Sequence, residues 1–241
     1  MMLLSRDKSL CCVAVSVMMV LTAAVLAPAK VAAQRTYSPN LSIGAKAGAT
    51  LSQMSFSPKV DQAMLSGFTF GGVVRYTEEK HVGIVAELNI SQRGWRESYE
   101  PGYDFKYKRT FTYLQLPVMT HIFFGSKRVR GFINLGPEIG IMLGSKISAN
   151  FDYRNVASVA GYPGGYRRTA QLDMEVKNRF DYGITAGIGG EYRITPRHSV
   201  MIEGRFYYGL GNVFPAARTD YFGASRGMSV EVTAGWLFRV R

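Results

Sequence analysis

The chain has 241 residues, with 29 lysines and arginines against 17 aspartates and glutamates, which gives a formal net charge of +12. A hydrophobic fraction of 47% with 12% aromatic residues excludes a disordered chain. The 26 glycines have no three-residue period, which excludes collagen. The only cysteines, Cys11 and Cys12, are adjacent and lie near the start. The rest of the chain therefore has no disulfide and no thiolate metal site.

Residues 1–33 have the pattern of a secretory signal peptide. Arg6 and Lys8 form a short basic segment, and the apolar stretch VAVSVMMVLTAAVLA follows it. The small residues Val31-Ala32-Ala33 then favour cleavage before Gln34. An uncleaved helical anchor is the alternative. Residues 34–241 are expected to form one exported domain, because a chain of this length usually makes a single core.

Eight segments after residue 40 have the two-residue period of β-strands. Apolar side chains alternate with polar or small ones, so each strand has one apolar and one polar face. Each segment has about ten residues or more, enough for a strand to cross a bilayer at a tilt. The segments are residues 41–50, 68–77, 82–91, 113–124, 133–143, 181–194, 200–210 and 229–240.

The connections between these segments alternate in length. The short ones are residues 78–80, 125–129 and 195–198, and the long ones are residues 51–66, 94–108, 146–179 and 211–227. A transmembrane barrel has this pattern, with short periplasmic turns and long extracellular loops. The sequence therefore predicts an all-β, eight-stranded antiparallel up-and-down barrel in the cell outer membrane. A soluble lipocalin-like barrel, with its apolar face inward, is the alternative.

Charged residues recur on the polar face of the predicted strands. On a lipid-facing surface a lysine or arginine costs about 2–4 kcal/mol at mid-bilayer, whereas inside a small lumen it can pair with carboxylates. Because eight strands leave room only for side chains, we expect a closed lumen with a structural charge network. The predicted members are Lys46, Arg75, Glu87, Glu138, Glu191, Arg193, Glu203, Arg205, Glu231 and Arg239. Glycines on the same face, such as Gly48 and Gly71, are expected to relieve crowding.

Two of the long connections, residues 94–108 and 146–179, are rich in tyrosine and arginine. Both residue types are favoured at recognition surfaces, and cations there also suit the phosphates of lipopolysaccharide. The candidate extracellular contact residues are Tyr99, Tyr103, Tyr107, Tyr162, Tyr166, Arg167 and Arg168. Hairpin tips that pack only on themselves are the alternative.

Four segments resemble the PorT-type outer-membrane β-barrel family of the Bacteroidota, whose barrels are similar to the eight-stranded OmpA and OmpX type. They read IGAKAGATLSQM, AELNISQRGW, FTYLQLPVMTHIFF and FINLGPEIGIMLGSK, and TYLQLP is the most specific part. The resemblance runs from about Leu41 to Val240. It implies an outer-membrane barrel without a catalytic or metal motif, and a link to a type IX-like secretion or surface-assembly complex.

The sequence contains little that indicates catalysis. Of the three histidines, only His121 lies on the polar face of a predicted strand, and no serine nucleophile motif accompanies it. No metal-ligand spacing or phosphate-binding loop is present, so no cofactor is expected. The cations are dispersed, which argues against nucleic acid as a partner. We therefore expect a non-enzymatic structural or interaction protein, with outer-membrane lipid, lipopolysaccharide and secretion-complex proteins as partners. A narrow pore or a small-ligand-binding barrel is the alternative.

Overall fold

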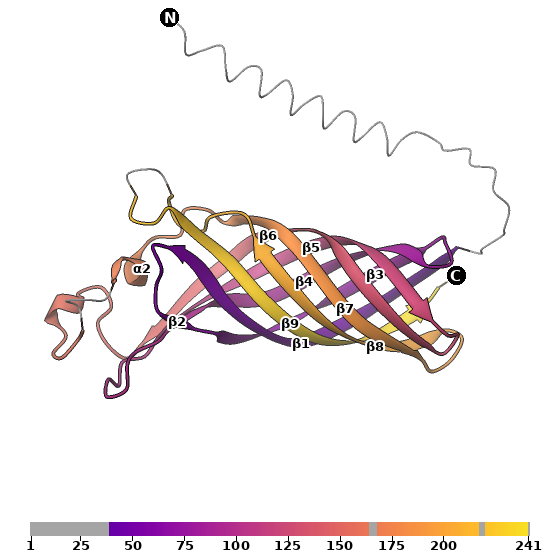
Figure 1. Cartoon of the computed structure of the whole chain (residues 1–241), viewed down its shortest axis with the longest axis horizontal. Coiled ribbons are helices and arrows are strands. Elements are labelled where there is room, and N and C mark those ends of the chain that lie inside the picture. Colours follow the sequence, from indigo (N-terminus) through magenta and orange to yellow (C-terminus); the bar gives the residue numbers. More distant parts are fainter. Residues whose placement is uncertain (1–38, 164–167, 217–219, 241) are drawn as a thin grey trace, which may run out of the picture. The chain divides into compact units, whose positions relative to one another are not determined.

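In a computed structural model, which describes residues 39–163, 168–216 and 220–240, eight long strands form a barrel (Figure 1). They are β1 (Asn40–Ser57), β3 (Leu65–Thr77), β4 (Val82–Glu97), β5 (Tyr107–Gly125), β6 (Val129–Ala149), β7 (Phe180–Arg193), β8 (His198–Gly209) and β9 (Ala224–Arg239). The short strand β2 (Gln62–Ala63) pairs with the end of β4. A 3-10 turn, η1 (Val156–Ser158), and a one-turn helix, α2 (Ala170–Asp173), interrupt the connection after β6. The predicted signal peptide, residues 1–33, lies outside the described residues.

Each of the eight strands is antiparallel to the next one along the chain. The first and last strands close the ring, with a register from Ser42 opposite Arg239 to Ser57 opposite Ala224. The predicted eight-stranded up-and-down architecture is confirmed. In residues 39–163, 168–216 and 220–240, no helix is long and apolar enough to cross a membrane.

The barrel is apolar outside and polar inside. Outward-facing side chains such as Ile188 and Ile202 are 65% and 60% exposed, whereas Lys46 and Glu203 on the inner face are 3% and 1% exposed. A soluble barrel would place its apolar side chains inside and its polar side chains outside, because the hydrophobic effect drives apolar surface away from water. The lipocalin-like alternative is therefore excluded, and the outer band of apolar side chains is the surface that faces lipid.

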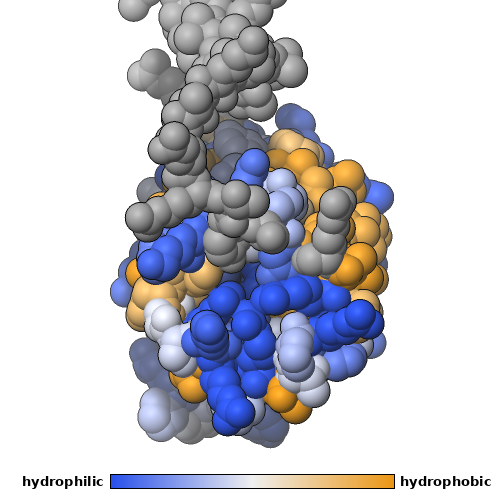
Figure 2. All heavy atoms as spheres, turned by 90° about the vertical axis from the view of Figure 1, so that its right-hand side faces the viewer, coloured by the Kyte–Doolittle hydropathy of each residue, from blue (hydrophilic) through white to orange (hydrophobic). Residues whose placement is uncertain are grey.

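The two ends of the barrel differ in the length of their connections. The turns β3–β4, β5–β6 and β7–β8 are short and lie together at the end where β1 begins and β9 finishes (Figure 1). Figure 2 shows hydrophilic residues gathered at this end, with apolar surface at their sides. The long connections lie at the opposite end. In outer-membrane barrels short turns are periplasmic and long loops are extracellular, which orients the molecule.

The strands extend further at the extracellular end than the sequence predicts. The structure continues β1 to Ser57 and β4 to Glu97, so the predicted loops at residues 51–66 and 94–108 are wrong at residues 51–57 and 94–97, which are strand. The reason is that the alternation inverts there: Met54 and Trp95 face inward and are buried, while Lys108 faces outward and is exposed. These strand ends rise beyond the lipid, so the outer face is polar and the inner face apolar.

The pairing of β5 with β6 has a register shift between Thr112 and Tyr113. It also changes which side chains face inward at the extracellular end. Beyond the shift Ile147 packs on a buried apolar cluster, although it has the opposite parity to the inward-facing Met142. A bulge of this kind inserts one extra residue into a strand and so changes which face the following side chains occupy.

Two glycines allow the close strand contacts that the barrel needs. A Cβ atom on Gly48 would lie 2.0 Å from the carbonyl oxygen of Val232, on the strand that closes the ring. On Gly71 it would lie 2.2 Å from the side-chain oxygen of Asn89. Any side chain at either position would therefore force the neighbouring strand or lumen residue to move.

Candidate functional site

The lumen contains a compact cluster of two cations and two carboxylates from β1, β4 and β8. The Arg205 guanidinium donates two hydrogen bonds to Glu87, at 2.7 and 2.8 Å, and one to Glu203 at 2.7 Å. The ammonium of Lys46 lies 2.7 Å from Glu87 and 3.5 Å from Glu203. All four side chains are almost fully buried. The charges balance, as buried ions require.

Arg93 forms a second cluster, nearer the extracellular end. Its guanidinium lies 2.7 Å from Glu138 and 3.2 Å from Glu231, and it covers the ring of Tyr207 at 3.9 Å. Arg93 is not among the predicted network residues, because it follows the third predicted strand by two positions and immediately precedes a predicted loop. The signal that could have found it is parity, since Arg93 is in phase with Glu87 along β4.

Toward the periplasmic end, Arg75 donates paired hydrogen bonds of 2.7 and 3.0 Å to Glu191. Arg193 and Arg239 are only half-buried and line a small cavity beside this pair, with Arg197 and Ser199. The structure therefore brings eight of the ten predicted network residues into paired positions inside the barrel and places Arg193 and Arg239 at its periplasmic mouth.

His121 faces the lumen but has no catalytic surroundings. Its Nδ1 atom is 2.7 Å from the side-chain oxygen of Asn134, whose amide donates a 2.7 Å hydrogen bond to Glu203. The adjoining cavity has a volume of only about 10 Å³ and no serine, threonine or cysteine in its wall. This volume is about that of one water molecule, so no substrate fits beside the imidazole. Within the described ranges, no group of three or more histidine, cysteine, aspartate or glutamate residues has a geometry for a metal ion.

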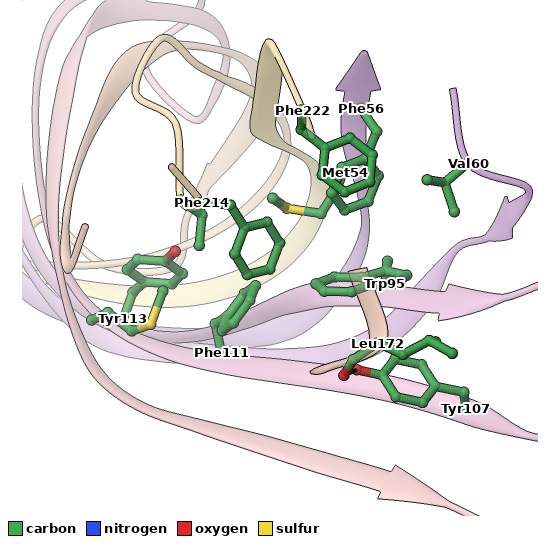
Figure 3. Close-up of a cluster of buried hydrophobic side chains, with 12 residues drawn as sticks. Met54, Phe56, Val60, Trp95, Tyr107, Phe111, Tyr113, Leu172, Phe214 and Phe222 are labelled. Atoms are coloured by element: carbon green, nitrogen blue, oxygen red, sulfur yellow. Dashed lines mark hydrogen bonds between the residues drawn. The ribbon is translucent and has the colours of Figure 1, made fainter. Parts of the chain in front are cut away.

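An apolar cluster closes the extracellular mouth of the barrel; we call it the aromatic cap. Figure 3 shows its side chains converging from β1, β4, β5 and the connections after β6 and β8. The Trp95 ring is fully buried, with centroids 5.3 Å from Phe56 and 5.9 Å from Phe214. The buried members of the cap are Met54, Phe56, Val60, Trp95, Tyr107, Phe111, Tyr113, Met142, Leu172, Val213, Phe214 and Phe222.

Hydrogen bonds hold the long connection between β6 and β7 in this mouth. The hydroxyl of Tyr107 donates to the carbonyl oxygen of Leu172 at 2.6 Å, and the Arg109 guanidinium donates to the carbonyl oxygen of Met174 at 2.6 Å. Glu97 accepts hydrogen bonds from Trp95 at 3.1 Å and from Gln171 at 3.2 Å. The loop is therefore part of the packed cap.

The predicted contact residues fall into separate groups. Tyr99 and Tyr162 belong to an aromatic group at the loop tips with Phe105 and Phe151, in which ring centroids lie 5.2 to 6.3 Å apart. Tyr103 stacks on the outer side of this group and is 38% exposed.

The other predicted contact residues do not join this group. Tyr107 is only 1% exposed, so its prediction as an extracellular contact is wrong: the strand that carries it continues above the lipid and turns its ring into the cap. Arg168 is exposed and donates to the hydroxyl of Tyr221 at 3.3 Å. Tyr166 and Arg167 lie outside the described residues.

The comparison with protein-family models agrees with this architecture. A family model described as "Outer membrane protein beta-barrel domain" matches residues 32–215. No curated protein matches the chain. Among solved structures, the chain is similar to OprG from Pseudomonas aeruginosa, with 11% identity over 84% of this chain and 96% of that chain, at a TM-score of 0.48.

Two further solved structures are also similar. For Neisserial surface protein A the identity is 15% over 84% of this chain and 99% of that chain, with a TM-score of 0.41. For Ail of Yersinia pestis, in complex with the heparin analogue sucrose octasulfate, the identity is 13% over 83% and 99%, with a TM-score of 0.38. The family match covers most of the described barrel, and the chain therefore belongs to the outer membrane protein β-barrel domain family.

Proposed function

We propose that the protein is a closed, non-enzymatic outer-membrane barrel that presents its extracellular loops to a partner at the cell surface. The observation that carries this proposal is the filling of the lumen. Paired charges occupy the barrel interior, and the aromatic cap closes its extracellular mouth. A barrel of this kind serves as a rigid support, so its function depends on what the support displays.

The narrow pore and the small-ligand barrel fit these observations less well. The two cavities beside Arg75, toward the periplasmic end of the lumen, have volumes of about 10 Å³ each, room for about one water molecule. The charges of Lys46, Arg93 and Arg205 are each engaged with carboxylates. A conducting lumen needs a continuous path of water, and a ligand site at this level of the lumen needs a cavity of roughly 300 Å³ or more. A larger hollow, of about 630 Å³, lies at the extracellular end beside Met54, Phe56 and Gln62, above the charged part of the lumen.

The loop tips supply the candidate interaction surface. Tyr99, Phe105, Phe151 and Tyr162 pack together, which fixes the tip of two connections, and Tyr103 is left partly exposed on this base. A tyrosine on a rigid base offers contact area at low entropic cost. The same packing is expected if the loop tips only stabilise themselves. The exposed side of Tyr103 is the feature that favours an interaction surface over self-packing tips.

A PorT-type role in a secretion or surface-assembly complex is the more specific form of this proposal. Its support is the resemblance of TYLQLP and the flanking segments, which lie on β5 and its neighbours. In this role the partners of the barrel are lipopolysaccharide and the proteins of the secretion complex.

Two measurements test the proposal. Purified barrel in planar bilayers is expected to show no stable conductance; regular single-channel openings would overturn the closed barrel. In a null strain of the source organism, a variant with residues 99–105 replaced by a glycine-serine linker is expected to fold and to fail in complementation. The control is Lys127→Ser with Arg128→Ser in a short turn, which leaves the loop tips intact. Full complementation by the folded loop variant would overturn the interaction role.

A further inference from the structure

A groove lies between the extracellular ends of β7 and β8. Its volume is about 470 Å³, within the range of roughly 300–1,000 Å³ typical of small-molecule sites. Backbone and side-chain hydrogen bonds join its two walls: the amide of Asn178 donates to the carbonyl oxygen of Asn212 at 2.8 Å, and the Leu210 N–H donates to the carbonyl oxygen of Tyr182 at 2.8 Å. The groove is therefore formed before any ligand arrives.

The wall of the groove changes from apolar to cationic along the strand direction. Phe180, Tyr182 and Leu210 are 55%, 47% and 40% exposed and belong to the lipid-facing band. Lys177 and Arg179 line the same groove just beyond the start of β7, and both are exposed. Aromatic side chains gather where a bilayer meets water. The groove thus lies at the height where the headgroups of the outer leaflet meet their acyl chains.

The two cations of the groove are available to a ligand. Among the described residues, neither Lys177 nor Arg179 has an ion pair. Asp181, the nearest carboxylate on β7, faces the lumen and accepts a 2.9 Å hydrogen bond from Tyr207. Glu175 is exposed two residues before Lys177 and forms no ion pair with it. A cationic site without a protein counterion is suited to an anionic ligand, and phosphate binds well to a lysine and arginine together.

We propose that this groove binds a phosphorylated glycolipid of the lipid A type from the outer leaflet. Lys177 and Arg179 contact a phosphate of the headgroup, and an acyl chain lies along Phe180, Tyr182 and Leu210. Charge and apolar surface in one groove favour an amphiphile over a free phosphate, which would leave the apolar wall unused. This inference deepens the proposed function and rests on its lipopolysaccharide partner class, to which it gives a site. The groove faces the membrane and is separate from the loop tips, so a failure here leaves the interaction role of the tips standing.

Native mass spectrometry of the folded full chain, released from nanodiscs, tests the proposal. The probes are bis-phosphorylated lipid A, the same lipid without phosphates, and phosphatidylglycerol. The unmodified barrel is expected to retain one bis-phosphorylated lipid, and Lys177→Gln with Arg179→Gln is expected to reduce its retention roughly 30-fold, at about fivefold for each cation near a membrane surface.

The matched control is Lys108→Gln with Lys146→Gln, which removes the same charge from two exposed residues on β5 and β6. Lys108 lies six residues from Leu114 of the apolar band, roughly 20 Å along the strand, and Lys146 lies three residues beyond Leu143, roughly 10 Å. Neither lysine lines the groove. The control variant is expected to keep the lipid. Equal retention by the groove variant and the unmodified barrel would overturn the proposal. So would equal binding of the dephosphorylated lipid or of phosphatidylglycerol. Heat-modifiable gel mobility verifies that every variant is folded, and the result does not depend on what the loop tips bind.

Discussion

Arg205 and Glu87 form two parallel hydrogen bonds of 2.7 and 2.8 Å that connect β8 to β4 through the middle of the lumen. These strands are not neighbours in the barrel wall. The pair therefore acts as a cross-link between opposite parts of the ring, and Lys46 from β1 adds a third strand to the same carboxylate.

Removing one member of this pair is expected to destabilise the barrel strongly. Glu87→Leu leaves Arg205 and Lys46 with one carboxylate in a buried site, and loss of one partner of a buried ion pair costs about 3–5 kcal/mol. Urea unfolding in lipid vesicles measures the change. Glu87→Leu combined with Arg205→Met is expected to recover part of the loss, because no unpaired arginine remains. A double variant that is no more stable than Glu87→Leu would contradict this account of the pair.

Trp95 is expected to hold the extracellular loops in place. Trp95→Ala removes a fully buried ring from the centre of the aromatic cap, and such truncations cost about 3–5 kcal/mol where the neighbours do not collapse. Because the cap lies beyond the lipid-facing band, the loss is expected to appear as faster proteolysis within residues 150–179. The strands below are expected to stay protected. Tyr103→Ala, at an exposed ring, is the control, and equal protease resistance of the two variants would contradict the prediction.

Closure of the ring is expected to depend on Gly48. An alanine there places its Cβ atom 2.0 Å from the Val232 carbonyl oxygen, so β9 must move away from β1. We expect Gly48→Ala to reduce the fraction of heat-modifiable barrel in outer-membrane preparations severalfold. Gly144→Ala serves as the comparison, because no atom lies within 4 Å of the added methyl group. Similar folded fractions for the two variants would show that the strands adjust without cost.

A charged side chain at the centre of the lipid-facing band is expected to destabilise the barrel. Ile188→Lys introduces an ammonium group on an outward face that is 65% exposed in the barrel and therefore contacts acyl chains. The expected destabilisation is about 2–4 kcal/mol, measured by reversible unfolding in vesicles. Ser148→Lys adds the same charge on the exposed outer face of β6, above the lipid. Its expected cost is only the repulsion from Lys108 directly opposite, below about 1 kcal/mol. A cost at Ser148 as large as that at Ile188 would contradict the assigned membrane position.

Much of the barrel could be predicted from residue order because strand alternation is a local property. Eight alternating segments and the alternation of short and long connections were enough for strand number, topology and the placement of residues such as Glu87 and Arg205 on the polar face. Alternation was insufficient where the strands leave the lipid. There the outer face becomes polar and the inner face apolar, so the pattern predicts a loop at Trp95 and Tyr107. Both residues lie on strands and point into the cap.

Residue order was enough to decide which side chains share a face of each strand, because alternate residues of a strand point to opposite sides. The tertiary structure decided that the apolar face is the outer one, which excludes a lipocalin-like barrel. Partner choice depended on the tertiary structure. Arg93 and Glu138 are 45 positions apart and Arg205 and Glu87 are 118 apart, and only strand register and barrel closure bring each pair within hydrogen-bond distance. The same holds for the groove at Lys177 and Leu210, whose walls meet because β7 and β8 end side by side. The local alternation along a strand decides to which side of the strand a side chain points. The residues that it contacts across the lumen are decided by the strand register and by closure of the barrel.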